Sequence, residues 1–177
     1  MFMGFAFVIL SCQDSEKNHE FDTELISITR FVDSFFLEND SIRSVTKTLI
    51  VNEGTPEIKT IEDYNIYEDL KMLKEFDVAT PRWADFFEIK KTDGAGLEKV
   101  EYTTENKKAP ASHLIFFRNN DTIQSVKIKS RKGTMISKQN TDIDWTPGEG
   151  YILRNHSKLL FQKPRTFQME VRYGNVK

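Results

Sequence analysis

The second half of the chain alternates apolar and polar side chains, the pattern of β-strands with one face on a core and one in water. Val126 and Ile128, for example, alternate with Lys127 and Lys129. Turn-forming residues, Asn155–His156 among them, separate short segments of this kind: 86–91, 99–103, 113–118, 126–131, 133–138, 151–154, 159–163 and 166–173. Because the connections are short, antiparallel neighbours are favoured over parallel crossovers. The sequence predicts a β-meander of about eight strands.

The first half has mainly the helical period. Apolar residues recur at helical spacing in residues 22–38, where Asp22 or Thr23 can cap the first amides. Residues 45–51 and 57–62 are β-prone and predict a hairpin. A second helix is expected from Asn65, with an apolar face made of Ile66, Leu70, Leu73 and Phe76. The expected fold class is α+β, with two N-terminal helices packed on a curved antiparallel meander.

Composition is ordinary for a soluble globular domain, since 38% of the residues are hydrophobic and 29% are charged. No repeat or Pro/Gly-rich linker divides the chain. We therefore expect one α+β domain over residues 22–177, which is a normal length for a single core.

The N-terminal residues contain the only cysteine. Residues 2–10 are apolar or small, a length typical of a signal peptide and too short to span a membrane as a helix. Cys12 follows Ser11 and is followed at once by the polar run Gln-Asp-Ser-Glu-Lys-Asn. The alternative is a buried N-terminal element with a core cysteine, but a core strand would not continue into such a polar spacer.

Residues 9–12, Ile-Leu-Ser-Cys, resemble the lipobox of bacterial lipoproteins. The resemblance implies a signal peptide at residues 1–11, an acylated Cys12, and a polar tether at residues 12–21. It also implies a lipid-anchored protein of the cell outer membrane, either periplasmic or surface-exposed.

A looser resemblance covers most of the mature chain. Residues 45–51, 67–77 and 79–81 are similar to segments of small envelope lipoproteins of Bacteroidota, which implies no particular activity. In outline, the architecture also resembles the lipoprotein-carrier fold, in which a curved sheet wraps helices around a lipid-sized hollow.

The two halves of the chain differ in net charge: the first is acidic and the second is basic. Residues 1–105 hold 11 Lys/Arg and 22 Asp/Glu, whereas residues 106–177 hold 14 Lys/Arg and 5 Asp/Glu. A basic half can indicate an anionic partner such as lipid A, acidic glycan or nucleic acid. Alternatively, the two halves pack together and partly neutralise each other. For an exported protein we expect no nucleic-acid partner.

Few residues suggest catalysis. With Cys12 acylated no thiol remains, which excludes disulfides, thiolate catalysis and cysteine-ligated metal. His19, His113 and His156 have no metal-ligand spacing, and Asp142 with Asp144 is a single carboxylate pair that could bind Ca²⁺ or act in acid/base chemistry. Because the pair has no further ligands, a solvated loop is the favoured interpretation. We expect no enzyme activity, no metal and no cofactor.

Two functions remain open for such a chain. The first is a binding or structural module of the envelope, held at the membrane by its lipid anchor and able to bind an envelope protein. The alternative is a carrier of lipid or another hydrophobic ligand, which requires a hollow between sheet and helices. The sequence identifies no ligand.

Overall fold

The computed structural model describes residues 25–38, 42, 44–94, 96–120 and 122–174. The expected signal peptide (residues 1–11), Cys12 and the rest of the tether up to residue 21 lie outside the described residues, as does His19. The described part begins at Leu25, within the domain expected over residues 22–177.

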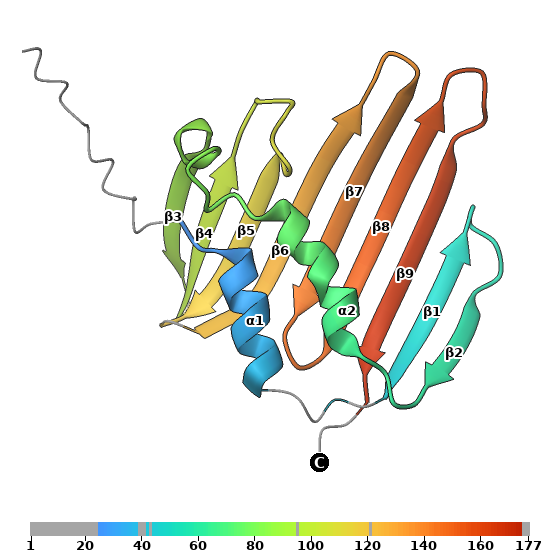
Figure 1. Ribbon diagram of the computed structural model, residues 1–177, viewed down its shortest axis with the longest axis horizontal. Helices are drawn as coiled ribbons and strands as arrows, with labels where there is room; N and C mark the ends of the chain where they lie inside the picture. Colours follow the sequence, from blue (N-terminus) through green and yellow to red (C-terminus); the bar gives the residue numbers. More distant parts are fainter. Residues whose placement is uncertain (1–24, 39–41, 43, 95, 121, 175–177) are drawn as a thin grey trace, which may run out of the picture.

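Within the described residues, nine strands form one sheet in the order β2-β1-β9-β8-β7-β6-β5-β4-β3 (Figure 1). Every neighbouring pair is antiparallel, and β3 to β9 follow one another as a meander. The expected α+β class with an antiparallel meander is confirmed. The strands are β1 (Val45–Val51), β2 (Glu57–Ile61), β3 (Glu88–Gly94), β4 (Leu97–Thr103), β5 (His113–Asn119), β6 (Thr122–Gly133), β7 (Ser137–Thr146), β8 (Gly150–Leu159) and β9 (Arg165–Tyr173).

The hairpin of β1 and β2 joins the meander at its last strand. β1 pairs with β9 from Val45 opposite Tyr173 to Val51 opposite Phe167, which brings the first strand beside the last. Gly150, at the start of β8, has a φ of 146°, and a Cβ there would lie 1.9 Å from the carbonyl oxygen of Val171. Only glycine fits this close approach of two backbones.

Helix α1 (Ile28–Glu38) is held at its first turn by two side chains. The Ser27 hydroxyl accepts a hydrogen bond from Arg30 N (3.2 Å), as an N-cap residue does. Asp77, from a segment 50 residues away, accepts bonds from Ser27 Oγ (2.7 Å) and Thr29 N (3.0 Å). The buried residues of α1 lie at helical spacing: Ile28, Val32 and Phe35.

Helix α2 (Ile66–Leu70) continues as the 3₁₀-helix η1 (Lys71–Phe76). It begins where the sequence predicts, because the Asn65 side chain accepts a hydrogen bond from Tyr67 N (3.1 Å) as an N-cap. The expected apolar face is confirmed, since all four of its residues are buried: Ile66, Leu70, Leu73 and Phe76. A short 3₁₀-helix, η2 (Ala84–Phe86), then leads into β3.

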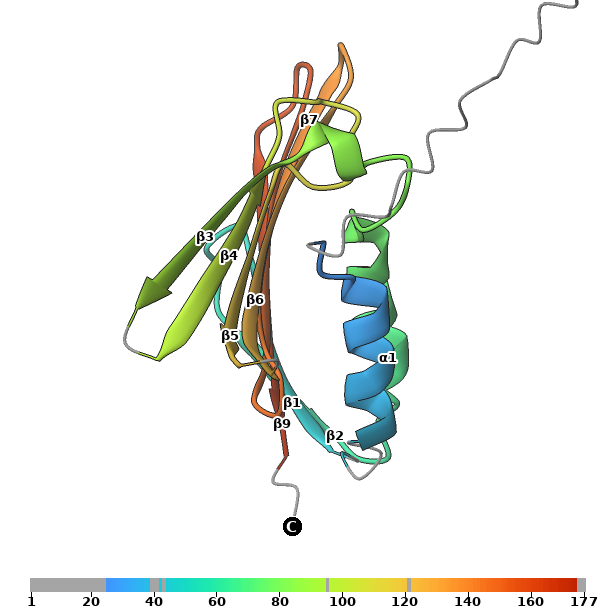
Figure 2. The same ribbon diagram turned by 90° about the vertical axis from the view of Figure 1, so that its left-hand side faces the viewer.

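Both helices lie over the same face of the curved sheet, and the opposite face carries no helix (Figure 2). Aromatic rings fill the layer between α1 and β7: the ring of Trp145 lies 5.0 Å from that of Phe31 and 5.4 Å from that of Phe35. Trp145 is only 1% exposed. The layer continues into β4 and β5, where the rings of Tyr102 and Phe116 lie 5.6 Å apart.

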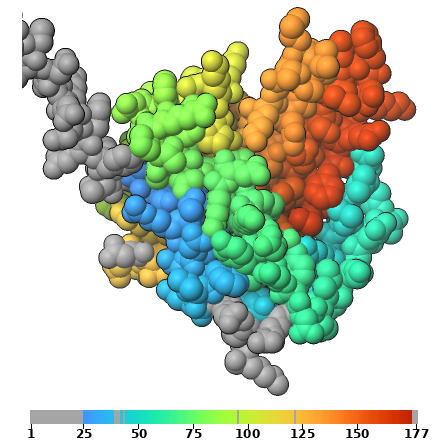
Figure 3. All heavy atoms as spheres, in the orientation of Figure 1, coloured from blue at the N-terminus to red at the C-terminus, as the bar shows by residue number. Residues whose placement is uncertain are grey.

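The helices do not cover the whole face. One cross-strand row on the helix side is fully buried in β4 to β7, at Tyr102, Leu114, Ile128 and Ile143. The same row is only half-buried in β8, β9 and β1, at Leu153, Met169 and Leu49. The far ends of β6 to β9 extend clear of the helices (Figure 3).

Four sequence predictions are corrected by the structure. The cap of α1 is Ser27, because the helix begins at Ile28 rather than near residue 22. Residues 159–163 form a hairpin turn rather than a strand, and residues 133–138 are interrupted by a turn at 134–136 between the end of β6 and the start of β7; the meander has seven strands rather than about eight. Asn155–His156 lies in the middle of β8 and not in a turn. The turns at 134–136 and 160–162 carry apolar side chains, so their residues were predicted as strands. Asn155 and His156 are polar but belong to β8, which is exposed on one face, so they were predicted as a turn.

Candidate functional site: the paired hairpin tips

The turn between β6 and β7 is closed by a side chain. Thr134 N donates to the Ser137 carbonyl oxygen (2.8 Å), and Thr134 Oγ1 accepts from Ile136 N (3.3 Å) and Ser137 N (3.1 Å). A threonine hydroxyl that bonds to amides two and three residues ahead stabilises a tight turn. The turn therefore forces Met135 and Ile136 to the end of the hairpin.

The turn between β8 and β9 lies beside it. Leu160 N donates to the Ile136 carbonyl oxygen (2.8 Å) and joins the two hairpins, while Gln162 N donates to the Leu159 carbonyl oxygen (3.1 Å). Phe161 adopts a φ of 63°, a left-handed conformation that is unfavourable for a bulky residue. The strained residue lies within the turn, and its ring is exposed to solvent.

We call five residues of these two turns the paired tips, and all five expose large apolar side chains. Met135 is 100% exposed and Phe161 is 98% exposed, and the other three are between 45% and 62% exposed: Ile136, Leu159 and Leu160. Large apolar side chains that gather on one protrusion mark an interaction surface more often than scattered ones do.

The sequence on either side of the paired tips is basic and contains no acid. Residues 125–141 include five Lys/Arg and no Asp/Glu, and residues 152–169 include four Lys/Arg and no Asp/Glu. The basic half of the sequence is therefore not uniformly basic in space. Its unbalanced positive charge surrounds the exposed apolar side chains.

Two sequence candidates, His113 and Asp144, lie on the sheet face opposite the helices, where they contact charged side chains. His113 Nε2 lies 2.5 Å from Glu101 Oε1, and Lys99 Nζ lies 2.6 Å from Glu101 Oε2. The hydrogen bond from Lys99 is the main cause that lowers the pKa of Glu101. Asp144 pairs with Arg154 (2.8 Å). These are surface contacts of a solvated face.

Asp142 and His156 lie on that face too, where they line a shallow hollow of about 370 Å³ across β7, β8, β9 and β1. Asp142 faces Lys129 and Arg154 on the neighbouring strands, which is unsuitable for a cation site. Within the described residues, no group of three His, Cys, Asp or Glu side chains could hold a metal ion. The structure thus brings Asp142 and His156 to one hollow, whereas His113 and Asp144 lie outside it.

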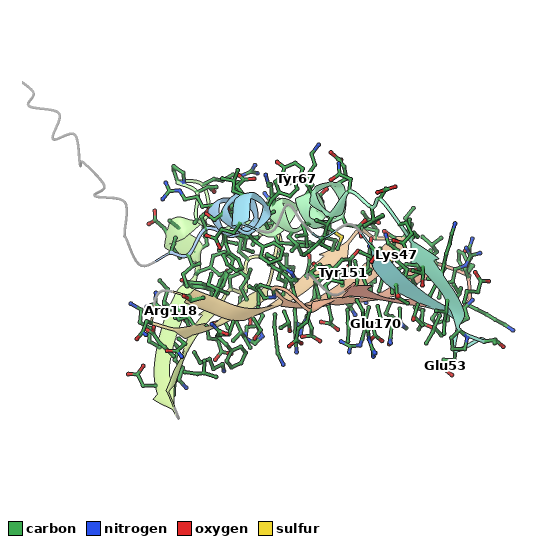
Figure 4. All side chains as sticks on the ribbon, turned by 90° about the horizontal axis from the view of Figure 1, so that it is seen from below. Lys47, Glu53, Tyr67, Arg118, Tyr151 and Glu170 are labelled. Carbon is green, nitrogen blue, oxygen red and sulfur yellow. The ribbon has the colours of Figure 1, made fainter. Side chains whose placement is uncertain are left out.

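A polar cluster between sheet and helices serves a structural purpose. Asp69 of α2 accepts hydrogen bonds from Tyr151 Oη (2.7 Å) and Lys47 Nζ (2.9 Å). Burial, and then the nearby Asp69 carboxylate, raises the pKa of both Tyr151 and Tyr64, so both stay protonated. Figure 4 shows Lys47 and Tyr151 between the two layers and Glu170 on the opposite face. The cluster ties α2 to β1 and β8.

The paired tips were not found from the sequence, because their apolar residues were interpreted as strands. The available signal was the combination of Thr134, Lys132–Gly133 and Lys163–Pro164, which are turn-forming residues adjacent to the apolar ones.

None of the described helices is long and apolar enough to cross a membrane. Comparisons with protein-family models, with curated proteins and with solved structures found no match.

Proposed function

We propose that this chain is a non-catalytic, lipid-anchored module of the bacterial outer membrane, and that its paired tips dock on an anionic membrane surface. One observation carries the docking function: five exposed apolar side chains protrude together from two segments, residues 125–141 and 152–169, that contain cations and no carboxylate. Apolar side chains enter the boundary between headgroups and acyl chains, while Lys and Arg are attracted to anionic lipids.

The magnitudes suffice for reversible binding. Burial of a fully exposed Phe or Met side chain contributes about 1.5–3 kcal/mol, and each Lys or Arg near an anionic surface contributes about 1 kcal/mol. Phe161 and Met135 with a few of the nine neighbouring cations could thus reach micromolar affinity, which needs about 8 kcal/mol. The hairpins are already ordered, so little conformational entropy is lost on docking.

The expected lipid at Cys12 adds a second attachment. Residues 13–24, between Cys12 and the first described residue, can span at most about 40 Å when fully extended. Helix α1 begins at the end that points in the same general direction as the paired tips (Figure 2). The anchor and the tips can therefore reach one membrane, and the anchor raises the effective concentration of the tips at its surface.

The alternative function, a carrier with a hollow between sheet and helices, is less well supported. The rings of Phe31, Phe35 and Trp145 occupy the layer under α1 where acyl chains would lie. A carrier would have to displace these rings, whereas docking by the tips requires no change in the core.

Vesicle co-sedimentation tests the docking. The soluble chain that starts at Gln13 keeps every described residue, and we expect it to bind vesicles of equimolar phosphatidylcholine and phosphatidylglycerol more tightly than phosphatidylcholine alone. Substituting Met135→Ser together with Phe161→Ser removes about 1.5–3 kcal/mol of apolar burial per site, so a loss of at least about a hundredfold is expected.

The matched control is Ile58→Ser together with Leu37→Ser. These side chains are 70% and 80% exposed, but they lie on β2 and α1 and not at the tips. The control should bind vesicles like the unaltered chain. Equal binding by both double variants would contradict docking through the tips and would favour an envelope protein as the partner.

The anchor is tested separately. Metabolic labelling of the full chain with a palmitate analogue should mark the unaltered protein and not Cys12→Ala. Equal labelling of both would contradict the lipoprotein part of the proposal and leave the docking experiment unaffected.

A further inference from the structure

A hollow of about 490 Å³ lies between the β1–β2 turn and the segment that leads from the paired tips into β9. Its lining residues are Asn52, Gln162, Lys163, Pro164 and Arg165. This volume is within the range of small-molecule sites. None of the lining residues carries a carboxylate.

The two sides of the hollow are tied together. Asn52 N donates to the Thr166 carbonyl oxygen (2.9 Å), and Thr166 N donates to Asn52 Oδ1 (3.0 Å). On the other side, Pro164 restricts the backbone φ and Gln162 N is bonded to the Leu159 carbonyl oxygen (3.1 Å). The hollow is therefore a built feature of two hydrogen-bonded turns, and it is open to solvent through the exposed side chains of Lys163 and Arg165.

The chemistry of the lining favours an oxyanion. Among the described residues, no hydrogen bond or ion pair involves the side chain of Lys163 or that of Arg165. Arg165 can offer two parallel N–H donors to a phosphate, and Lys163 supplies a compact positive charge. The side-chain amide of Gln162 is a further hydrogen-bond donor. The nearest carboxylate in sequence, Glu53, follows Asn52 in the β1–β2 turn but lines the other hollow, the one of about 370 Å³ on the sheet face opposite the helices (Figure 4).

The distance from the paired tips matches the depth of a lipid headgroup. Lys163 and Arg165 follow Phe161 by two and four residues, which places them at most roughly 7 and 13 Å from it. The headgroup layer on each side of a bilayer is about 5–8 Å thick, and interfacial apolar groups reach about 5–10 Å into it. With Phe161 at the acyl boundary, the hollow lies at the level of the lipid phosphates.

We propose that this hollow is a binding site for the phosphate group of an anionic phospholipid. The inference rests on the proposed docking, which brings the hollow to the membrane, and it adds a specific contact to an otherwise general attraction. Arg165 and Lys163 contact the phosphate oxygens, and Gln162 contacts the ester oxygens or the adjoining headgroup hydroxyls.

The test compares two double variants with the same loss of charge. Lys163→Gln with Arg165→Gln alters the hollow, and Arg131→Gln with Lys138→Gln removes two exposed cations from the β6–β7 hairpin. Each lost cation should weaken binding to phosphatidylglycerol vesicles roughly fivefold by general electrostatics. The hollow variant should lose about tenfold more than its charge-matched control, because it also loses the bidentate contact.

A second measurement separates a lipid phosphate from a free one. In NMR titrations of the soluble chain, dispersed short-chain phosphatidylglycerol should shift the amide signals of residues 162–165, and the hollow variant should abolish these shifts. Shifts of the same residues by inorganic phosphate alone, with none from the lipid, would overturn the assignment to a lipid.

The outcomes distinguish this inference from the proposed docking. Equal losses of vesicle binding in the hollow variant and its control would overturn the phosphate site and leave docking intact. If Met135→Ser with Phe161→Ser has no effect on vesicle binding, the proposed docking through the tips is overturned. The phosphate site is then overturned too, because it reaches the membrane only through docking.

Discussion

Asp77 joins the segment after η1 to the first turn of α1, so its substitution should destabilise the whole helix layer. The carboxylate accepts hydrogen bonds from Ser27 Oγ (2.7 Å), Thr29 N (3.0 Å) and Ala79 N (3.0 Å). A hydrogen bond to a charged group contributes about 1.5–3 kcal/mol, and loss of an N-cap contact about 0.5–2 kcal/mol. We expect Asp77→Ala to lower the free energy of unfolding by about 2–4 kcal/mol and Asp77→Asn by about 1–2 kcal/mol.

The effect should depend on pH in a defined direction. Burial acts to raise the pKa of Asp77, but the hydrogen bonds from Thr29, Ser27 and Ala79 outweigh it and lower the pKa below its ordinary value. A carboxyl with a lower pKa in the folded state stabilises the fold fully above its unfolded pKa of about 3.9. This stabilisation is lost as the pH falls through about 4 toward the folded pKa.

Urea unfolding at several pH values measures both effects. The difference in unfolding free energy between the unaltered chain and Asp77→Asn should be constant from about pH 7 to pH 5 and should shrink below about pH 4. Taking the difference cancels the contributions of Glu98 and Glu101, whose pKa values are also lowered by their basic partners. A difference that stays constant to pH 3, or a loss under about 0.5 kcal/mol in Asp77→Ala, would refute this reasoning.

Three further changes should reduce stability, each measured by thermal or urea unfolding. Trp145→Ala should lower the free energy of unfolding by about 3–5 kcal/mol, because the largest fully buried side chain is removed from the layer under α1. A loss no larger than that for an exposed residue would mean that the layer is not packed. Gly150→Ala should prevent native pairing of β8 with β9, because its Cβ would lie 1.9 Å from the Val171 carbonyl oxygen; normal folding would contradict this close approach. Tyr151→Phe should cost about 1–2 kcal/mol, since the hydrogen bond to Asp69 is lost, and an unchanged melting temperature would mean that this bond contributes nothing.

Much of the architecture could be predicted from the sequence, because local patterns determine it. Burial on one side of a strand imposes a period of two, and Val126, Ile128 and Val171 are buried as that period predicts. The Asn65 cap and the apolar face of α2 were likewise recognisable from spacing alone. The pairing of β1 with β9 could not be predicted, because it joins residues more than 110 positions apart and no local pattern encodes it.

The candidate site was missed for a related reason. Apolar side chains next to β-prone residues predict a strand when burial is assumed, and the β8–β9 tip combines both properties in Leu159 and Leu160. Only the three-dimensional structure shows that the strands turn there and leave these side chains in water. The positive charge of the second half was visible in the sequence, but its concentration around the tips depends on two hairpins lying side by side.

The conformation of Phe161 indicates a residue retained for binding rather than for stability. Its left-handed φ of 63° costs an L-residue about 1–2 kcal/mol, and its ring is 98% exposed. Glycine adopts this conformation without strain. However, glycine loses more conformational entropy on folding, which costs about 0.5–1 kcal/mol. Phe161→Gly should therefore raise the free energy of unfolding by about 0.5–1 kcal/mol.

The same substitution should weaken binding to phosphatidylglycerol vesicles by about tenfold or more, because about 1.5–3 kcal/mol of apolar burial is lost. Stability and binding would then change in opposite directions, as expected where a strained residue serves an interaction. Urea unfolding and vesicle co-sedimentation of one protein preparation measure the two effects. A destabilised variant that still binds vesicles normally would mean that the Phe161 ring supports the hairpin and does not contact the membrane.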